Sequence, residues 1–216
     1  TRVVTQLIAN LGGSFTLDAA LPALRSARDR VPLAGQWQAR AFDLVEGTRD
    51  IANKPAITPI SSAALAAVTE ALDGDAWSAA SVPGMWSGFG ESRYGEAVFR
   101  REVMIPEAWA GQDLVIEMGA VDDADITFWN GIEIGSGEGW NVARRYRIPG
   151  EQVRAGANQL AVRVFNNFLA GGFNAKPGEM VVYPASRAES GGGGYYHADY
   201  RSDFANGDDP YRYIRW

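Results

Sequence analysis

Short stretches in which apolar and polar residues alternate recur from residue 31 onward, and they predict β-strands. The alternation is clearest over 114–118, 126–128 and 160–164, where every second residue is apolar, so each stretch has one buried face. The expected strands are Leu33–Phe42, Ala97–Ile105, Asp113–Met118, Asp125–Trp129, Glu133–Ile134, Asn158–Phe165 and Glu179–Tyr183. Strands of this length, separated by turns, predict an all-β antiparallel sandwich over residues 31–189.

Turn and helix signals divide these strands. Asn130-Gly131 predicts a tight hairpin, because both central residues of a type I′ turn need a positive φ. Pro106 and Pro149 each follow a strand, where an amide donor is no longer needed. One inserted helix is expected over Ala63–Leu72, with Ser61-Ser62 as its N-terminal cap.

The two ends of the chain differ from the sandwich. Residues 1–30 carry apolar positions at helical spacing and predict a short N-terminal helical extension. Residues 190–216 begin with the glycine linker Gly191–Gly194. The last 22 residues contain five Tyr, one Phe, one Trp, three Arg and four Asp. A disordered tail would lack aromatic residues, so we expect this one to pack across the sandwich.

Composition excludes several kinds of chemistry. With no Cys and only one histidine, His197, the chain cannot form disulfides, thiolate zinc sites or a site with two imidazoles. Its net charge of -6 argues against nucleic-acid binding, and no apolar run approaches the roughly 20 residues that span a membrane. The chain begins at Thr1, which fits a removed leader or a piece of a longer protein, and we expect a secreted or periplasmic location.

The segment from Trp77 to Phe165 carries an ordered set of motifs. They are WSAASVPGMW, FRREVMIPEAWAGQDL, DDADITFWNGIEIG and RYRIPGEQVRAGANQLAVRVFN. This order resembles the sugar-binding jelly-roll domain, galactose-binding-like in type, of glycoside hydrolase family 2 enzymes. It is equally similar to the related sandwich of sialate O-acetylesterases. The resemblance implies a jelly-roll sandwich that accompanies a separate catalytic domain.

From this resemblance we expect a non-catalytic, carbohydrate-binding accessory module of a larger glycan-degrading enzyme. The alternative is a structural module that docks on a catalytic domain or a partner subunit. Fold alone does not decide between them, because one fold serves many functions.

The first candidate site is the glycine-rich segment Gly135–Arg145, interpreted as a loop. Trp140 would stack on a sugar ring, while Glu138, Asn141 and Arg144 would bond its hydroxyl groups. In the alternative, Trp140 packs against the sandwich edge and Arg144 or Arg145 pairs with Asp122 or Asp123.

Asn166 and Asn167 leave the last core strand and would reach the same end of the sandwich, where loops commonly bind ligands. A purely structural role for this connection, which continues through Gly171–Asn174, is the alternative.

Asp122, Asp123 and Asp125 form an acidic cluster that could hold a structural Ca²⁺, an ion that prefers oxygen ligands. An arginine could neutralise the cluster instead, and Arg101 is a candidate because it shares a strand face with Phe99 and Val103. No cofactor is otherwise expected.

Catalysis by this chain alone is the least favoured hypothesis. A serine hydrolase would use His197 with Ser190, but the GxSxG elbow and the Asp-x-x-His pattern of the esterases are absent. A glycosidase needs two carboxylates that face one sugar. The candidates are Glu138, Glu179, Asp208 and Asp209, and nothing in their spacing pairs them.

Overall fold

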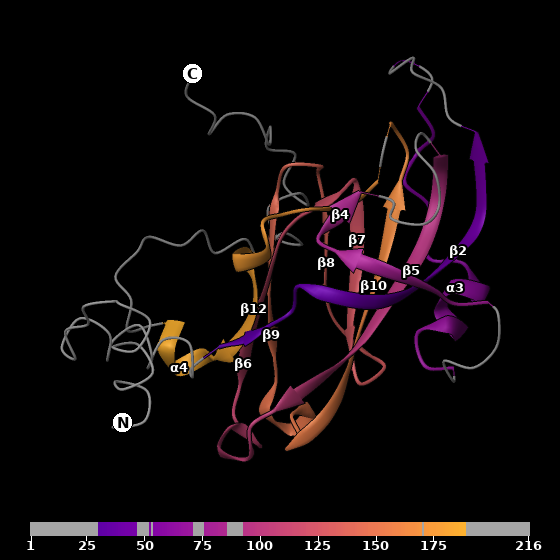
Figure 1. Cartoon of the computed structure of the whole chain (residues 1–216). Helices are drawn as coiled ribbons and strands as arrows, with labels where there is room; N and C mark the ends of the chain where they lie inside the picture. Colours follow the sequence, from indigo (N-terminus) through magenta and orange to yellow (C-terminus); the bar gives the residue numbers. More distant parts are fainter. Residues whose placement is uncertain are drawn as a thin grey trace, which may run out of the picture.

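The computed structural model describes residues 30–46, 52, 54–70, 76–85, 93–169 and 171–188. Within them the chain forms two antiparallel β-sheets that pack face to face (Figure 1). The predicted helical extension of residues 1–30 and the aromatic tail of residues 190–216 lie outside the described residues, apart from Arg30. No helix in the described ranges is long and apolar enough to cross a membrane.

One sheet, called the β5 sheet here, has the strand order β3-β2-β5-β10-β7-β8. Its strands are β3 (Ser78–Val82), β2 (Gly35–Glu46), β5 (Arg93–Ile105), β10 (Gly156–Asn166), β7 (Ala124–Trp129) and β8 (Ile132–Glu138). The other, called the β6 sheet, has the order β1-β12-β6-β11-β4, and β9 also pairs with β6. Its strands are β1 (Val31–Pro32), β12 (Met180–Pro184), β6 (Leu114–Asp122), β11 (Gly172–Asn174), β4 (Gly84–Met85) and β9 (Ala143–Ile148). The described residues also form 3-10 helices at η2 (Glu107–Trp109), η3 (Gly150–Gln152) and η4 (Pro177–Glu179), and helix α4 (Ala185–Ala188) follows β12.

Two of the three apolar faces that the alternation predicts meet between the two sheets, whereas Ile126 and Phe128 lie on the other face of the β5 sheet, in a second cluster with Ala64 and Ala67. Ile116 and Met118 from β6 and Leu160 and Val162 from β10 are all fully buried in one core. Phe173 lies at its centre, with its ring centroid 5.2 Å from that of Phe99 and 5.7 Å from that of Trp37. The two inner faces interdigitate in this way in β-sandwiches generally.

The hairpin at Asn130-Gly131 is confirmed. Asn130 has a φ of 52° and Gly131 a φ of 83°, the two positive values that a type I′ turn requires. The Asn130 side chain is held by Asn158 and by the backbone of Gln152 and Gln159. The turn therefore joins β7 to β8 and anchors both to the start of β10.

The inserted helix is also present, as α3 (Ser62–Ala67), but it ends five residues earlier than predicted. Ser61 caps it, accepting a hydrogen bond from Ala64 N at 3.1 Å. Helix α3 lies on the face of the β5 sheet that points away from the β6 sheet (Figure 1), where Ala64 and Ala67 pack on Phe42 and Val98. At its C-terminal end, Arg100 Nη1 donates hydrogen bonds to the carbonyls of Ala67 and Glu70.

Within the described residues, the sequence analysis missed five strands: β1, β3, β4, β9 and β11. The most consequential is β9, because Gly135–Arg145 is not one loop. Residues 135–138 belong to β8 and residues 143–145 to β9, so only a short turn separates them. The alternation was hidden because one of the buried residues of β9, Arg144, is charged.

Candidate functional site

The turn Gly139–Val142 carries Trp140 and Asn141 at one end of the sandwich. Gly139 has a φ of 100°, and its carbonyl accepts a hydrogen bond from Val142 N at 3.2 Å. Trp140 is 57% exposed and Asn141 is exposed as well. More than half of the Trp140 side chain is therefore exposed at this turn.

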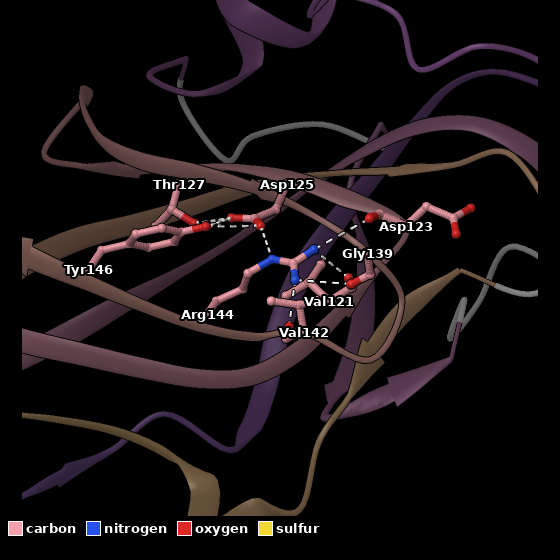
Figure 2. A network of polar contacts seen from close by, with 8 residues as sticks. All are labelled: Val121, Asp123, Asp125, Thr127, Gly139, Val142, Arg144 and Tyr146. Atoms are coloured by element: carbon pink, nitrogen blue, oxygen red, sulfur yellow. Dashed lines mark hydrogen bonds and ion pairs between the residues drawn. The ribbon is translucent and has the colours of Figure 1, made fainter. Parts of the chain in front are cut away.

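The buried Arg144 side chain bonds the backbone of this turn (Figure 2). Its Nη1 donates to the carbonyls of Gly139 at 3.0 Å and Val142 at 2.5 Å, and its Nη2 donates to Val121 O at 2.7 Å. A longer contact of 3.4 Å joins Nη2 to Asp123 O. Because Arg144 is 2% exposed, the prediction that it binds a sugar is corrected: it positions the backbone that carries Trp140.

The partner of Arg144 is Asp125. Arg144 Nε lies 2.5 Å from Asp125 Oδ1, and Thr127 and Tyr146 donate hydroxyl hydrogen bonds to the same carboxylate at 2.8 and 3.0 Å. Burial raises the pKa of Asp125, and Arg144 and the hydroxyl donors oppose that rise. Burial, followed by the charge of Asp125, raises the pKa of Tyr146. The group is a closed polar network inside the sandwich rather than a reactive centre.

Two glycines of β8 make room for this network. A Cβ atom on Gly135 would lie 2.2 Å from the ring of Tyr146, and one on Gly137 would lie 2.9 Å from Arg144 Nε. The absence of side chains here lets β8 pass over the side chains of β9. The glycines of the predicted binding loop thus serve packing.

The acidic cluster does not converge on one point. Asp125 is engaged with Arg144, and Figure 2 shows the Asp123 carboxylate turned away from that guanidinium. Among the described residues, no three His, Cys, Asp or Glu side chains gather as a metal site would need. The predicted Ca²⁺ site with Asp122, Asp123 and Asp125 as ligands is therefore not formed. Arg101, proposed to neutralise the cluster, instead reaches the carbonyls of Leu33 and Ala34.

Asp122 and Asp123 form a carboxyl pair of their own. Asp122 is 9% exposed, and burial, followed by the charge of Asp123, raises its pKa to about 8. Asp123 Oδ2 accepts a hydrogen bond from Asn167 N at 2.9 Å. Both acids thus belong to the framework of the same sandwich end that carries Trp140.

Asn166 and Asn167 do lie at this end, as predicted, but they are buried. Asn166 Nδ2 donates to the carbonyls of Arg93 and Leu169, and Asn167 Nδ2 donates to Pro55 O at 2.8 Å. Their predicted role as ligand contacts is corrected to a structural one, because the amides tie loop backbone together. The buried Oδ1 of Asn167 has no hydrogen-bond partner within the described part of the chain.

Of the predicted sugar contacts, three remain accessible: Glu138, Trp140 and Asn141 are exposed side by side around the turn. Arg145 pairs with Glu117, at 3.4 Å, instead of with Asp122 or Asp123. Sequence reasoning missed two further exposed apolar residues at this end, Met85 and Leu169. Met85 pairs with Gly172, which also pairs with Asp122. The pairing of β11 with both β4 and β6 therefore places Met85 near Asp122, which the sequence alone does not show.

Most of the residues in the catalytic hypothesis lie outside the described part of the chain. His197, Ser190, Asp208 and Asp209 lie outside the described residues. Glu179 is bound at its own 3-10 helix, where its carboxylate accepts a hydrogen bond from Lys176 N at 2.9 Å.

No protein-family model and no curated protein matches this sequence. Among solved structures, the chain is similar to a β-glucuronidase of an uncultured Clostridium sp., with a TM-score of 0.54 and 17% identity over 72% of this chain. It is similar to a β-glucuronidase of Ruminococcus gnavus, with a TM-score of 0.51 and 16% identity over 72% of this chain. The match covers 29% of each of those enzymes. At this level of identity the likeness shows the fold: this chain has the architecture of a β-sandwich segment found within larger β-glucuronidases.

Proposed function

We propose that this chain is a non-catalytic domain of a larger glycoside hydrolase and that it binds carbohydrate at the sandwich end that carries Trp140. Two observations support the first part. The chain resembles only 29% of the length of the β-glucuronidases, and its motifs resemble an accessory domain. A secreted or periplasmic location fits a glycan-degrading partner.

The exposed indole of Trp140 carries the proposal for binding. Sugars present a flat face of C–H groups, which stacks on an aromatic ring, and hydroxyl groups, which bond short planar side chains. Asn141 and Glu138 provide such polar groups beside Trp140. Arg144 fixes the turn through its buried hydrogen bonds, so the platform loses little conformational freedom on binding.

The shape of the sandwich favours this end over the outer face of the β5 sheet. Helix α3 and the segment before it cover part of that face. Arg163 Nη2 bonds Thr58 O at 2.9 Å, and Glu96 accepts a hydrogen bond from Ser61 N at 3.1 Å. A glycan that lay across the sheet there would have to displace buried ionic anchors.

Calorimetry with oligosaccharides selected on a glycan array tests the proposal. Trp140→Ala should weaken binding at least tenfold, because a stacked aromatic ring contributes most of the apolar contact. Its stability should stay within about 0.5 kcal/mol of the parent, since the side chain is exposed. Met104→Ala is the matched control, because Met104 is 59% exposed on β5 and should leave affinity unchanged. Equal affinity of parent and Trp140→Ala, or the absence of any glycan ligand, would contradict the proposal.

A second candidate function is docking on a catalytic domain or subunit. Met85, Trp140 and Leu169 are large exposed apolar residues at the same end, and such groups often mark protein contacts. The aromatic tail provides the distinguishing variant. If docking is its role, deleting residues 195–216 should change the assembly state in analytical ultracentrifugation while glycan affinity is kept.

A further inference from the structure

We infer that the pocket on the outer face of the β5 sheet, where β3, β2 and β5 lie side by side, binds the protonated amine of a small molecule, with Glu102 as its counter-charge. The pocket has a volume of about 430 Å³, within the range of small-ligand sites. Gln36, Gln38 and Glu102 are among its lining residues. The site is separate from the Trp140 end, and the inference does not rest on the proposed function.

The strand register places the polar side chains of the pocket on one face. Gln38 of β2 pairs with Arg100 of β5 on one side and with Ala79 of β3 on the other. Residues that pair across strands share a face, and so do residues two apart in one strand. Gln36 and Glu102 therefore project from the same face as Gln38.

The pocket is hollow because the side chains around it are small or packed elsewhere. Trp37 and Arg101 line it with their backbone, since their side chains point to the inner face, where the Arg101 guanidinium carbon lies 5.8 Å from the Trp37 ring centroid. On the outer face, Ala79 presents only a methyl group. Helix α3 packs farther along this face, on Phe42 and Val98, so the pocket lies beside the helix rather than under it.

The polar atoms around the pocket are mainly hydrogen-bond acceptors. Gln36 Nε2 donates to Ser81 Oγ at 3.1 Å, which engages the donor end of this amide and leaves Oε1 to accept. The side chains of Gln38 and Glu102 are exposed and make no hydrogen bond to the described residues. A carboxylate only accepts hydrogen bonds, whereas an ammonium group only donates them, through three N–H groups.

Arg100 lines the pocket as well, but it does not neutralise Glu102. Its Nη1 donates to the carbonyls of Ala67 at 3.1 Å and Glu70 at 2.6 Å, at the C-terminal end of α3. Burial lowers the pKa of Arg100, and the charge that opposes this change is that of Glu70. Among the described residues, no ion pair includes Glu102. Its carboxylate therefore favours a cationic ligand and disfavours an anionic one.

The spacing of the acceptors suits one ammonium group. Gln38 lies two residues from Gln36 and diagonally across from Glu102, and Cβ atoms in these relations are about 5–8 Å apart. Three flexible side chains at this spacing can converge on one nitrogen. A calcium ion would need about six or more oxygen ligands, and no three His, Cys, Asp or Glu side chains gather anywhere in the described residues.

Three related sugars isolate the charge, so D-galactosamine, N-acetyl-D-galactosamine and D-galactose are suitable probes for NMR titration of the full chain at mildly acidic pH. We expect galactosamine to bind about fivefold more tightly than either neutral sugar, the gain that an ion pair open to solvent provides. The largest shifts should occur at the backbone amides of Gln38 and Glu102.

Glu102→Gln keeps the size of the side chain, removes its charge and should abolish the preference for galactosamine. The exposed position of Glu102 lets this variant fold as the parent does. Glu107→Gln, at an exposed glutamate outside the pocket, is the matched control and should keep the preference. Gln38→Ala should weaken galactosamine binding roughly threefold through the loss of one acceptor.

The Trp140→Ala variant separates this site from the proposed glycan site. Retained galactosamine binding in Trp140→Ala would support an amine site on the β5 sheet, whether or not glycan binding is lost. Equal affinities for galactosamine and galactose, an unchanged preference in Glu102→Gln, or loss of galactosamine binding in Trp140→Ala would each overturn the inference.

Discussion

Glu96 and Arg100 project four residues apart from the outer face of β5 and hold opposite ends of helix α3. Glu96 Oε1 accepts a hydrogen bond from the N-cap residue Ser61, while Arg100 Nη1 donates to the carbonyls of Ala67 at 3.1 Å and Glu70 at 2.6 Å. Four residues of strand span about 13 Å, which matches a six-residue helix of about 9 Å with its caps. An acid at the N-terminus and a base at the C-terminus also complement the helix dipole.

The buried charges beneath α3 make its docking sensitive to a single substitution. Glu96→Gln would leave Arg163, which bonds Glu96 at 2.8 Å, as a buried cation without an ion-pair partner. We expect a loss of about 3–5 kcal/mol in the free energy of unfolding, measured in urea. Amide hydrogen exchange over Ser62–Ala67 should also accelerate. Glu107→Gln, at an exposed glutamate, should change stability by less than about 0.5 kcal/mol. Equal losses of stability in Glu96→Gln and Glu107→Gln would contradict the stabilising role of Glu96 beneath α3.

The free energy of unfolding should fall strongly when one partner of the Asp125–Arg144 ion pair is removed and the other remains. Arg144→Met alone would strand a buried carboxylate and lower the free energy of unfolding by about 3–5 kcal/mol. The double variant Asp125→Leu with Arg144→Met removes both charges and should be more stable than Arg144→Met alone. Arg147→Met is the surface control: its pair with Asp113 is exposed on the arginine side, and its loss should change stability far less than Arg144→Met does. A double variant that is less stable than either single one would refute this account.

Gly135 should tolerate no side chain. In Gly135→Ala the new Cβ would lie 2.2 Å from the Tyr146 ring, which is packed against Asp125 and cannot move aside freely. Overpacking of this kind costs about 1–3 kcal/mol, observable as a lower midpoint in thermal unfolding. Gly178→Ala is the comparison, because a Cβ there would meet nothing within 4 Å. Similar melting temperatures for the two variants would show that β8 can shift away from β9.

Asp122 should make the protein less stable as the pH rises. Its pKa is about 8 in the folded chain and about 3.9 when unfolded, so between these values the folded state binds more protons. The stabilisation is therefore complete below about pH 4 and is lost as the pH rises toward 8, by at most about 1.4 kcal/mol per pH unit.

Asp122→Asn removes that titration. Urea unfolding at several pH values should show a smaller loss of stability between pH 5 and 8 in the variant than in the parent. Asp113→Asn serves as the control, since Arg147 and Gly150 N lower the pKa of Asp113 and its contribution is lost at acidic pH instead. Parallel pH profiles of the parent and Asp122→Asn would show that Asp122 does not hold its proton.

Much of the fold was predictable because its signals are local. The Asn130-Gly131 turn, the Ser61 cap and the strands around Ile116, Phe128 and Val162 depend on residues close together in the chain. Strand β9 was missed because its alternation of Arg144, Tyr146 and Ile148 places a charged residue at a buried position. Gly135 and Gly137, spaced to face Tyr146 and Arg144, were the available signal.

The candidate site was only partly predictable, because polar residue types do not reveal whether they face solvent. Trp140, Asn141 and Glu138 are exposed as expected, whereas Arg144, Asn166 and Asn167 are buried in hydrogen bonds to backbone carbonyls. Their partners are up to 112 residues away in sequence.

By itself, the sequence determined the all-β character, the main strands and the Asn130-Gly131 turn, since each follows from the periodicity and the conformational preferences of neighbouring residues. Only the tertiary structure decided which charges are paired inside and which remain available. Asp125 and Arg144 meet because two different sheets bring β7 and β9 together, whereas Arg101 bonds the backbone carbonyls of Leu33 and Ala34. Burial makes such pairings strong, and burial is a property of the whole fold.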